Sequence, residues 1–309
     1  MERHRLRVLV DFDGVWTSVD GQAHAVDAAR GRRLAELSGL PGGVVAQCEA
    51  SVAEAIAADP LGHGWRLDGR ITAYADEDPF LRHNALCTGI GILAERGHGA
   101  CLALRQALAA GGHTDLGALG SAIFMEASHA YLDDHGHDLL PSAPGVLTSL
   151  LAIADVVFCT NFTSDAVARS WTPLGFSFAG AQATPGLTLR GEARKQTLTA
   201  DPARTVLFGD RPVPVDRSFY RAAIEAEQPD IVVGDVFSLD LALPLTMTAD
   251  GHPTCRPLCL LARTRFTPPW SLDLARDGRL PGLRLLESLA DLVPLVEEIA
   301  DAHGGRGRP

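Results

Sequence analysis

Short apolar runs that end at polar residues recur along this chain. They read LRVLV at 6–10, DVVFC at 155–159, DIVV at 230–233 and PLCLLA at 257–262. Unbroken apolar runs of this length are typical of strands that are buried on both faces, as in a parallel sheet. The pattern therefore predicts four parallel strands.

Helical patterns precede or follow these runs. One occupies 145–154, a second occupies 216–227 with Asp216 placed to cap it, and a third closes the chain at 286–300. Pro294 lies inside the third pattern, so we expect a kink there. Strands that alternate with helices predict an α/β fold with a doubly wound parallel sheet.

The segment between the first two strands has no convincing alternation of apolar and polar residues. Five helical patterns occupy it instead, at 23–38, 43–58, 79–96, 100–110 and 116–134. So long an insertion exceeds a crossover loop and predicts a separate domain. We therefore expect an α/β core made of 1–17 and 141–302, an all-helical insert over 18–140 and a disordered tail over 303–309.

The charge and the apolar content exclude some classes of function. The formal net charge of −11 argues against a nucleic-acid partner or an anionic membrane surface, because both need a basic footprint. No run approaches the ~18 apolar residues of a membrane helix. The apolar stretch at the N-terminus is too short for a signal peptide, so a cytoplasmic protein is predicted.

Six cysteines are scattered along the chain and form no C-x-x-C pair. Cys255 and Cys259 are the closest two, and a zinc site there would lack a second pair of ligands. Reduced, buried thiols are therefore expected rather than a disulfide framework.

Polar side chains follow three of the predicted strands. Ligands of open α/β sheets bind beyond the carboxyl ends of the strands, and parallel strands bring those ends to one edge. Carboxylates gathered there repel one another unless a cation neutralises them, and oxygen ligands suit Mg²⁺. Each motif alone also has a structural explanation, as an Asp-Gly turn or a helix cap. The residues concerned are Asp11 with Asp13, Thr160 with Asn161, and Asp235 with Asp240.

Together these motifs resemble the haloacid dehalogenase (HAD) superfamily. RVLVDFDGV is similar to its first motif, VVFCTN to its second and DIVVGDVFSLD to its fourth. The resemblance covers 6–16 and 141–300, and the helical insert matches a C1 cap in position and type. It implies a HAD-like Rossmannoid core.

The resemblance also implies the roles of individual residues. Asp11 would attack phosphorus and become an aspartyl phosphate, while Asp13 would protonate the leaving oxygen and then activate water. Thr160 and Asn161 would contact a phosphoryl oxygen. The implied Mg²⁺ site comprises the Asp11 side chain, the Asp13 backbone carbonyl and Asp235, with Asp240 bonded to a ligand water or orienting its neighbours.

The third motif of the superfamily is a lysine that precedes the fourth motif. Arg211 stands 24 positions before Asp235, where that lysine is expected, and it keeps the positive charge. Lys195 is the rival, and spacing places Arg211 ahead of it as the catalytic, phosphate-binding cation. Gly209-Asp210 resembles the fourth motif superficially and is interpreted as a decoy, that is, a Gly-Asp pair that does not belong to the metal site.

The sequence thus predicts a Mg²⁺-dependent phosphate monoester hydrolase that acts on a small phosphorylated metabolite. Asp13 favours phosphoryl transfer, because the dehalogenases of the superfamily lack that residue. A phosphomutase or phosphotransferase is an alternative. A catalytically impaired binding or regulatory protein is another, which the arginine in place of lysine would favour. His135 and His137 are expected to be solvated, and Trp16 is expected either at a pocket mouth or packed under the insert.

Overall fold

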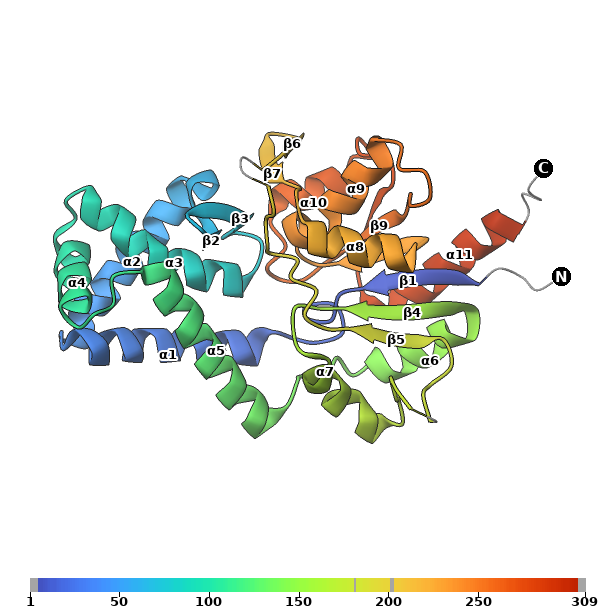
Figure 1. Ribbon diagram of the computed structural model, residues 1–309, viewed down its shortest axis with the longest axis horizontal. Coiled ribbons are helices and arrows are strands. Elements are labelled where there is room, and N and C mark those ends of the chain that lie inside the picture. The colour runs from blue at the N-terminus through green and yellow to red at the C-terminus, as the bar shows by residue number, and fades with distance from the viewer. Residues whose placement is uncertain (1–4, 181, 201–202, 305–309) are drawn as a thin grey trace. The chain divides into compact units, whose positions relative to one another are not determined.

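The computed structural model describes residues 5–180, 182–200 and 203–304 (Figure 1). The chain divides into two compact units, one formed by 1–18 with 137–309 and the other by 19–136. These boundaries lie within a few residues of those expected from the sequence.

The first unit is built on a six-stranded sheet in which every neighbouring pair is parallel. The order is β10-β9-β8-β1-β4-β5, so β1 lies inside the sheet. The expected doubly wound α/β fold is confirmed. Its strands are β1 (Leu6–Val10), β4 (Ala154–Cys159), β5 (Leu187–Arg190), β8 (Ile231–Gly234), β9 (Leu258–Ala262) and β10 (Leu283–Leu286).

The four strands predicted from apolar runs are β1, β4, β8 and β9. The two that the pattern missed, β5 and β10, are the edge strands. Each has four residues, of which only some are buried, so neither forms an unbroken apolar run.

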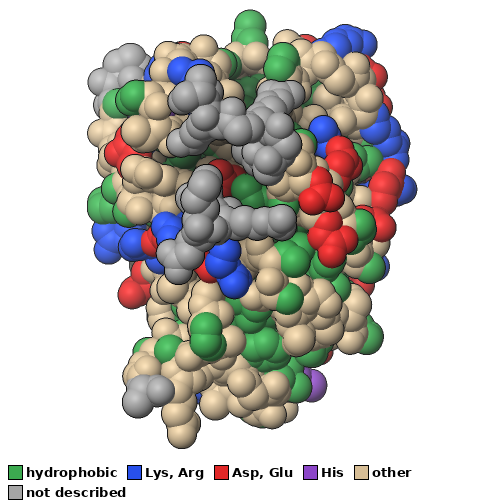
Figure 2. Space-filling model, turned by 90° about the vertical axis from the view of Figure 1, so that its right-hand side faces the viewer, with side chains coloured by type: hydrophobic (Ala, Val, Ile, Leu, Met, Phe, Trp, Pro, Cys, Tyr) green, Lys and Arg blue, Asp and Glu red, His purple; other side chains and the backbone are tan. Residues whose placement is uncertain are grey.

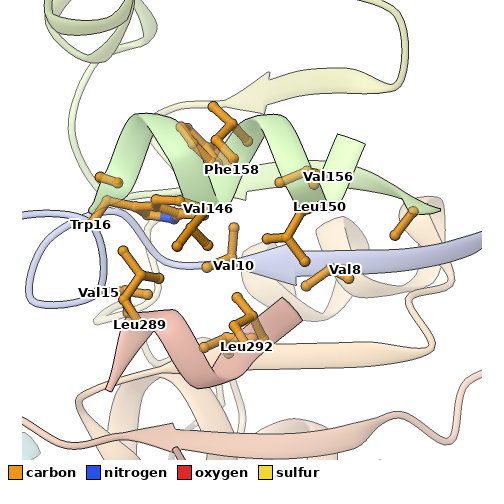
Figure 3. Packing of buried hydrophobic residues seen from close by; sticks show 14 of the residues in the cluster. Val8, Val10, Val15, Trp16, Val146, Leu150, Val156, Phe158, Leu289 and Leu292 are labelled. Carbon is orange, nitrogen blue, oxygen red and sulfur yellow. The ribbon is translucent and has the colours of Figure 1, made fainter. Parts of the chain in front are cut away.

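Helices cover both faces of this sheet (Figure 1). Val8 and Val10 point to the face covered by α6 and α11, where Leu150 and Leu292 pack against them (Figure 3). Leu9 alternates to the opposite face, on the side of α8. The helices of this unit are α6 (Ala143–Ile153), α7 (Ser164–Trp171), α8 (Ser218–Glu227), α9 (Ala242–Ala249), α10 (Pro269–Arg276) and α11 (Leu292–Gly304).

Three local expectations in this unit need correction. Asp216 does not cap α8, because its carboxylate accepts the backbone N–H of Arg204 and the helix begins two residues later. Pro294 lies in the first turn of α11, where its missing N–H has no intrahelical partner to lose, so no kink is needed. The same helix includes 303–304 of the expected disordered tail, while 305–309 lie outside the described residues.

The indole of Trp16 also differs from its expectation. Trp16 is fully buried, and its ring centroid lies 5.2 Å from that of Phe158 and 5.6 Å from that of Trp171. It belongs to the apolar core of the first unit beside β4 (Figure 3), rather than lining a pocket mouth.

The second unit has its own apolar core and the five helices expected from the sequence. It also contains an antiparallel hairpin, β2 (Gly64–Leu67) with β3 (Arg70–Tyr74), which corrects the expectation of an all-helical insert. Asp68 and Gly69 form its turn with φ of 50° and 75°, a conformation that Asp-Gly pairs favour. The helices are α1 (Asp20–Ser38), α2 (Gly42–Ala58), α3 (Pro79–Glu95), α4 (Gly99–Ala110) and α5 (Leu116–His135).

The two points where the chain leaves and rejoins the core are held together. Thr17 and Leu139 form an antiparallel bridge, and Ser18 N–H donates to Asp138 O at 2.8 Å. Both stretches belong to the first unit, so the connection to the insert begins from a paired segment.

Within the described residues, no helix is long and apolar enough to cross a membrane. All six cysteines are unpaired and buried, as expected. On the face drawn in Figure 2, acidic and basic side chains are interspersed rather than gathered in one basic patch.

Candidate active site

Asp11 stands directly after β1, at the carboxyl edge of the sheet. Its backbone N–H donates to Val233 O at 2.9 Å, which extends the pairing of β1 with β8 by one step. The nearest cation is Lys195, whose Nζ lies 2.8 Å from Asp11 Oδ1. The Lys195 side chain is only 2% exposed and that of Asp11 is 15% exposed, so this ion pair is shielded from solvent.

Asp240 holds the same ammonium from the opposite side. Its Oδ1 lies 2.8 Å from Lys195 Nζ, and its Oδ2 accepts the N–H of Val236 at 3.1 Å. A short π-helix over Phe237–Leu241 brings Asp240 back to the end of β8. Single π-helical turns of this kind are often found at functional sites. Gly234 makes this return possible, because a Cβ there would lie 2.2 Å from the Cβ of Asp240.

Three carboxylates meet at this edge. One oxygen each from Asp11, Asp235 and Asp240 lies within 4.8 Å of the others. Gly14 completes the enclosure. Its φ is +71°, and a Cβ on it would lie 2.0 Å from Asp235 Oδ2. The Asp-Gly pair of the first motif therefore leaves room for the carboxylate of the fourth.

The carboxylates at this edge carry more negative charge than the Lys195 ammonium offsets, so a further cation could bind there. Burial raises the pKa of Asp11 to about 6, the attraction of Lys195 opposes this rise and the repulsion of Asp240 adds to it. Burial by itself would lower the pKa of Lys195, yet Asp11 and Asp240 outweigh it and hold that pKa well above its ordinary value. Lys195 thus contacts two of the three carboxylates, and hard oxygen ligands in this number fit Mg²⁺.

The loop after β5 carries Lys195 in a constrained backbone conformation. Glu192 and Arg194 have φ of +53° and +49°, a region that costs a non-glycine residue about 1–3 kcal/mol. Hydrogen bonds hold this loop against the end of β4. Ala193 N–H donates to Thr160 O at 2.9 Å, and Lys195 N–H donates to the side-chain oxygen of Asn161 at 2.8 Å.

Thr160 and Asn161 lie where the second motif predicts them, directly after β4. Thr160 is buried, and its Oγ1 accepts the N–H of Phe162 at 3.1 Å, so its hydroxyl proton points elsewhere. The side-chain oxygen of Asn161 accepts the backbone N–H of Lys195, so its amide NH2 is the group that would contact a phosphoryl oxygen. The hydrogen bond to Lys195 positions the lysine loop.

The preference for Arg211 over Lys195 is corrected by the structure. Lys195 contacts Asp11, whereas Arg211 begins β7 (Arg211–Pro214) in a hairpin with β6 (Thr205–Phe208). The guanidinium carbon of Arg211 lies 5.0 Å from the ring centroid of Trp270. Asp210 lies in the turn of that hairpin and outside the carboxylate cluster, as its interpretation as a decoy requires.

One signal in the sequence could have identified the cation. Lys195 is the only lysine among 309 residues, and every other basic position except histidine is arginine. A compact ammonium can contact two carboxylates within a small space, where a planar guanidinium would need more room. The use of lysine at position 195 alone, with arginine at the other basic positions, therefore points to Lys195 as the cation of the site.

Asp13 and the two histidines are placed as follows. Asp13 is partly buried in the turn that follows Asp11. His135 is exposed at the end of α5, as expected. His137 is not simply solvated, because its Nδ1 lies 2.7 Å from Ser170 Oγ and burial lowers its pKa to about 4.

No protein-family model matches this chain, and no curated protein matches it. Solved structures do. A haloacid dehalogenase-like family hydrolase from Xanthomonas campestris is 14% identical, with 98% of this chain and all of the other covered and a TM-score of 0.45. The putative HAD-hydrolase YfnB from Bacillus subtilis, solved with magnesium, is 12% identical over 95% and 99% of the two chains, with a TM-score of 0.42.

A 2-haloacid dehalogenase from Pseudomonas syringae is also similar. It is 16% identical over 96% of this chain and 99% of its own, with a TM-score of 0.40. These solved structures belong to the superfamily that the three motifs resemble. They include hydrolases and a dehalogenase.

Proposed function

We propose that this chain is a Mg²⁺-dependent phosphate monoester hydrolase that acts through an aspartyl phosphate on Asp11. The observation that carries the proposal is the buried arrangement at the end of β1, where Lys195 joins Asp11 to Asp240. The substrate class is a small phosphorylated metabolite rather than a nucleic acid or a membrane surface.

The two carboxylates of the first motif divide the reaction between them. A carboxylate oxygen of Asp11 attacks phosphorus, and the bond from phosphorus to the ester oxygen breaks while Asp13 donates a proton to that oxygen. Asp13 then takes a proton from water, which attacks the same phosphorus. Breakage of the bond from phosphorus to Asp11 releases inorganic phosphate and restores the carboxylate.

The donor set at the strand ends fits Mg²⁺. Asp11 and Asp235 would hold the ion together with the backbone carbonyl of Asp13. Both oxygens of Asp240 already accept hydrogen bonds, so Asp240 would orient its neighbours rather than ligate directly. When bound, Mg²⁺ would offset negative charge on the phosphoryl group.

Lys195 and Thr160 add fixed donors. The Lys195 ammonium lies against Asp11, so it keeps the attacking carboxylate in place and offsets the charge that accumulates when a phosphoryl group approaches. Thr160 has its hydroxyl proton available for a phosphoryl oxygen, since its oxygen serves as the acceptor for Phe162 N–H.

The position of Lys195 also bears on the alternatives. The arginine in place of the third-motif lysine is the one feature that favours a non-catalytic binding protein, and the contact of Lys195 with Asp11 weighs against that alternative. Asp13 favours phosphate esters over haloacids, because a leaving halide needs no proton.

A screen for phosphate release tests the proposal. The protein would be incubated with a panel of phosphate monoesters in Mg²⁺ or in EDTA, with Asp11→Asn as the matched inactive variant. We expect release that needs both Mg²⁺ and Asp11. Halide release from 2-haloacids, with no phosphate release from any ester, would refute the phosphatase and indicate a dehalogenase. Acceptor sugars added to the active reaction would reveal a mutase or transferase.

A further inference from the structure

The start of helix α8 contacts the backbone of both residues in the Lys195–Asp240 ion pair. Arg217 Nη1 donates to Lys195 O at 2.5 Å, and the hydroxyl of Tyr220 donates to Asp240 O at 2.9 Å. Since Lys195 Nζ lies 2.8 Å from Asp240 Oδ1, these contacts form a closed ring. One helix end therefore fixes the positions from which the two charged side chains meet.

Both donors are buried deeply. Arg217 is 1% exposed and Tyr220 is fully buried. A polar group is costly to bury unless it forms hydrogen bonds, so such contacts give a single geometry that solvent cannot replace. The ring of Tyr220 also lies against the cation, with its centroid 5.5 Å from Lys195 Nζ.

The lysine needs this support for two reasons. Its loop contains Glu192 and Arg194 with positive φ, which persists only where the surroundings enforce it. Its side chain has four flexible carbons, so a shift of the backbone would move the ammonium away from Asp11. Errors of about 1 Å in such a position can cost on the order of a hundredfold in rate.

We propose that Arg217 and Tyr220 are positioning residues that hold the Lys195 ammonium at Asp11 through the backbone carbonyls of Lys195 and Asp240. This proposal rests on the phosphatase function for its kinetic consequences and on the hydrogen bonds alone for its structural ones. Neither residue touches the reacting atoms. Their effect passes through Lys195.

The kinetic test is a double-mutant cycle. Arg217→Met would be made in the wild type and in a Lys195→Met background, with Arg221→Met on the exposed side of the same helix as the matched control. We expect Arg217→Met to lower kcat by roughly tenfold to a hundredfold with little change in KM. In the Lys195→Met background the same change should lower kcat by no more than about twofold, because no ammonium remains to be positioned. Arg221→Met should be neutral in both backgrounds.

A purely structural role predicts another result. Arg217→Met would then lower activity by the same factor in both backgrounds, in step with the fraction of unfolded protein. That outcome would overturn the proposal. If Arg217→Met does not fold, Tyr220→Phe and Arg217→Lys carry the same cycle. Tyr220→Phe removes a single oxygen, and Arg217→Lys is expected to keep part of the activity.

The single lysine of this chain allows a test that needs no activity. Protein labelled with [ε-¹⁵N]lysine has one side-chain ammonium resonance, which reports the surroundings of Lys195 directly. We expect this resonance to shift or broaden in Arg217→Met and in Tyr220→Phe, and to stay unchanged in Arg221→Met. An unchanged resonance in both α8 variants would overturn the positioning proposal even in an active enzyme. A shifted resonance in a protein that releases no phosphate would uphold the positioning and refute the phosphatase.

Discussion

Replacement of Lys195 by methionine removes the ammonium and keeps most of the volume of the side chain. The variant leaves Asp11 and Asp240 facing each other without the cation that now lies 2.8 Å from both. The two carboxylates would then repel, and Asp11 would lose the donor that holds it in its attacking position. We therefore expect a loss both of stability and of turnover.

The size of each loss follows from burial. Removal of one partner from a buried ion pair costs about 3–5 kcal/mol. Because the Asp11 side chain is 15% exposed and can take up a proton, we expect the lower end, about 3 kcal/mol, near pH 7.5. Burial already raises the pKa of Asp11 to about 6, and loss of Lys195 would raise it further, so a fall from pH 7.5 to pH 5 should protonate Asp11, relieve the repulsion and reduce the loss. kcat/KM should fall by roughly a hundredfold or more.

Urea unfolding at pH 7.5 and pH 5 measures the first loss, and steady-state phosphate release measures the second. Arg211→Met is the matched comparison, since it removes the cation that sequence spacing favours. We expect this change to lower kcat/KM by less than about tenfold. A mild effect of Lys195→Met beside a severe effect of Arg211→Met would refute the reasoning from the ion pair.

Further predictions concern the carboxylates and the glycine beside them. Asp11→Asn should abolish turnover while leaving the fold intact, whereas retained activity would show that another residue attacks phosphorus. Asp13→Asn should slow both half-reactions and let the aspartyl phosphate accumulate with good leaving groups, which mass spectrometry of the trapped protein would locate on Asp11 or elsewhere. Asp235→Ala should raise the Mg²⁺ concentration for half-maximal activity at least tenfold, while Asp210→Ala should leave it unchanged; equal effects would mean that the carboxylate cluster does not bind the ion. Gly14→Ala should cost about 1–2 kcal/mol through its positive φ and raise the Mg²⁺ requirement by pushing Asp235 aside, and calorimetry with a metal titration would check both.

The sequence by itself determined the features that depend on local patterns. Apolar runs located β1, β4, β8 and β9, and helical periodicity located all five helices of the insert. The meeting of Asp11, Asp235 and Asp240 could be predicted because each follows such a run, and parallel strands carry their ends to one edge. These inferences need only the order of elements along the chain.

Other features have no strong local signal. The edge strands β5 and β10 are short and partly exposed, so their residues do not form apolar runs. The only sequence signal for the β2–β3 hairpin of the insert is its Asp-Gly turn. The side-chain oxygen of Asn161 binds the backbone of a loop 34 residues further along the chain, a contact that no local pattern indicates.

The choice of cation was decided by tertiary structure. Spacing along the chain favoured Arg211, which is the same distance from Asp235 in any fold. What brings Lys195 to Asp11 is the pairing of β5 beside β4 and the hydrogen bonds that turn the following loop back toward β1. Spacing along the chain limits which residues can contact Asp11. Contacts between elements place Lys195 between Asp11 and Asp240, and no pattern along the chain indicates those contacts.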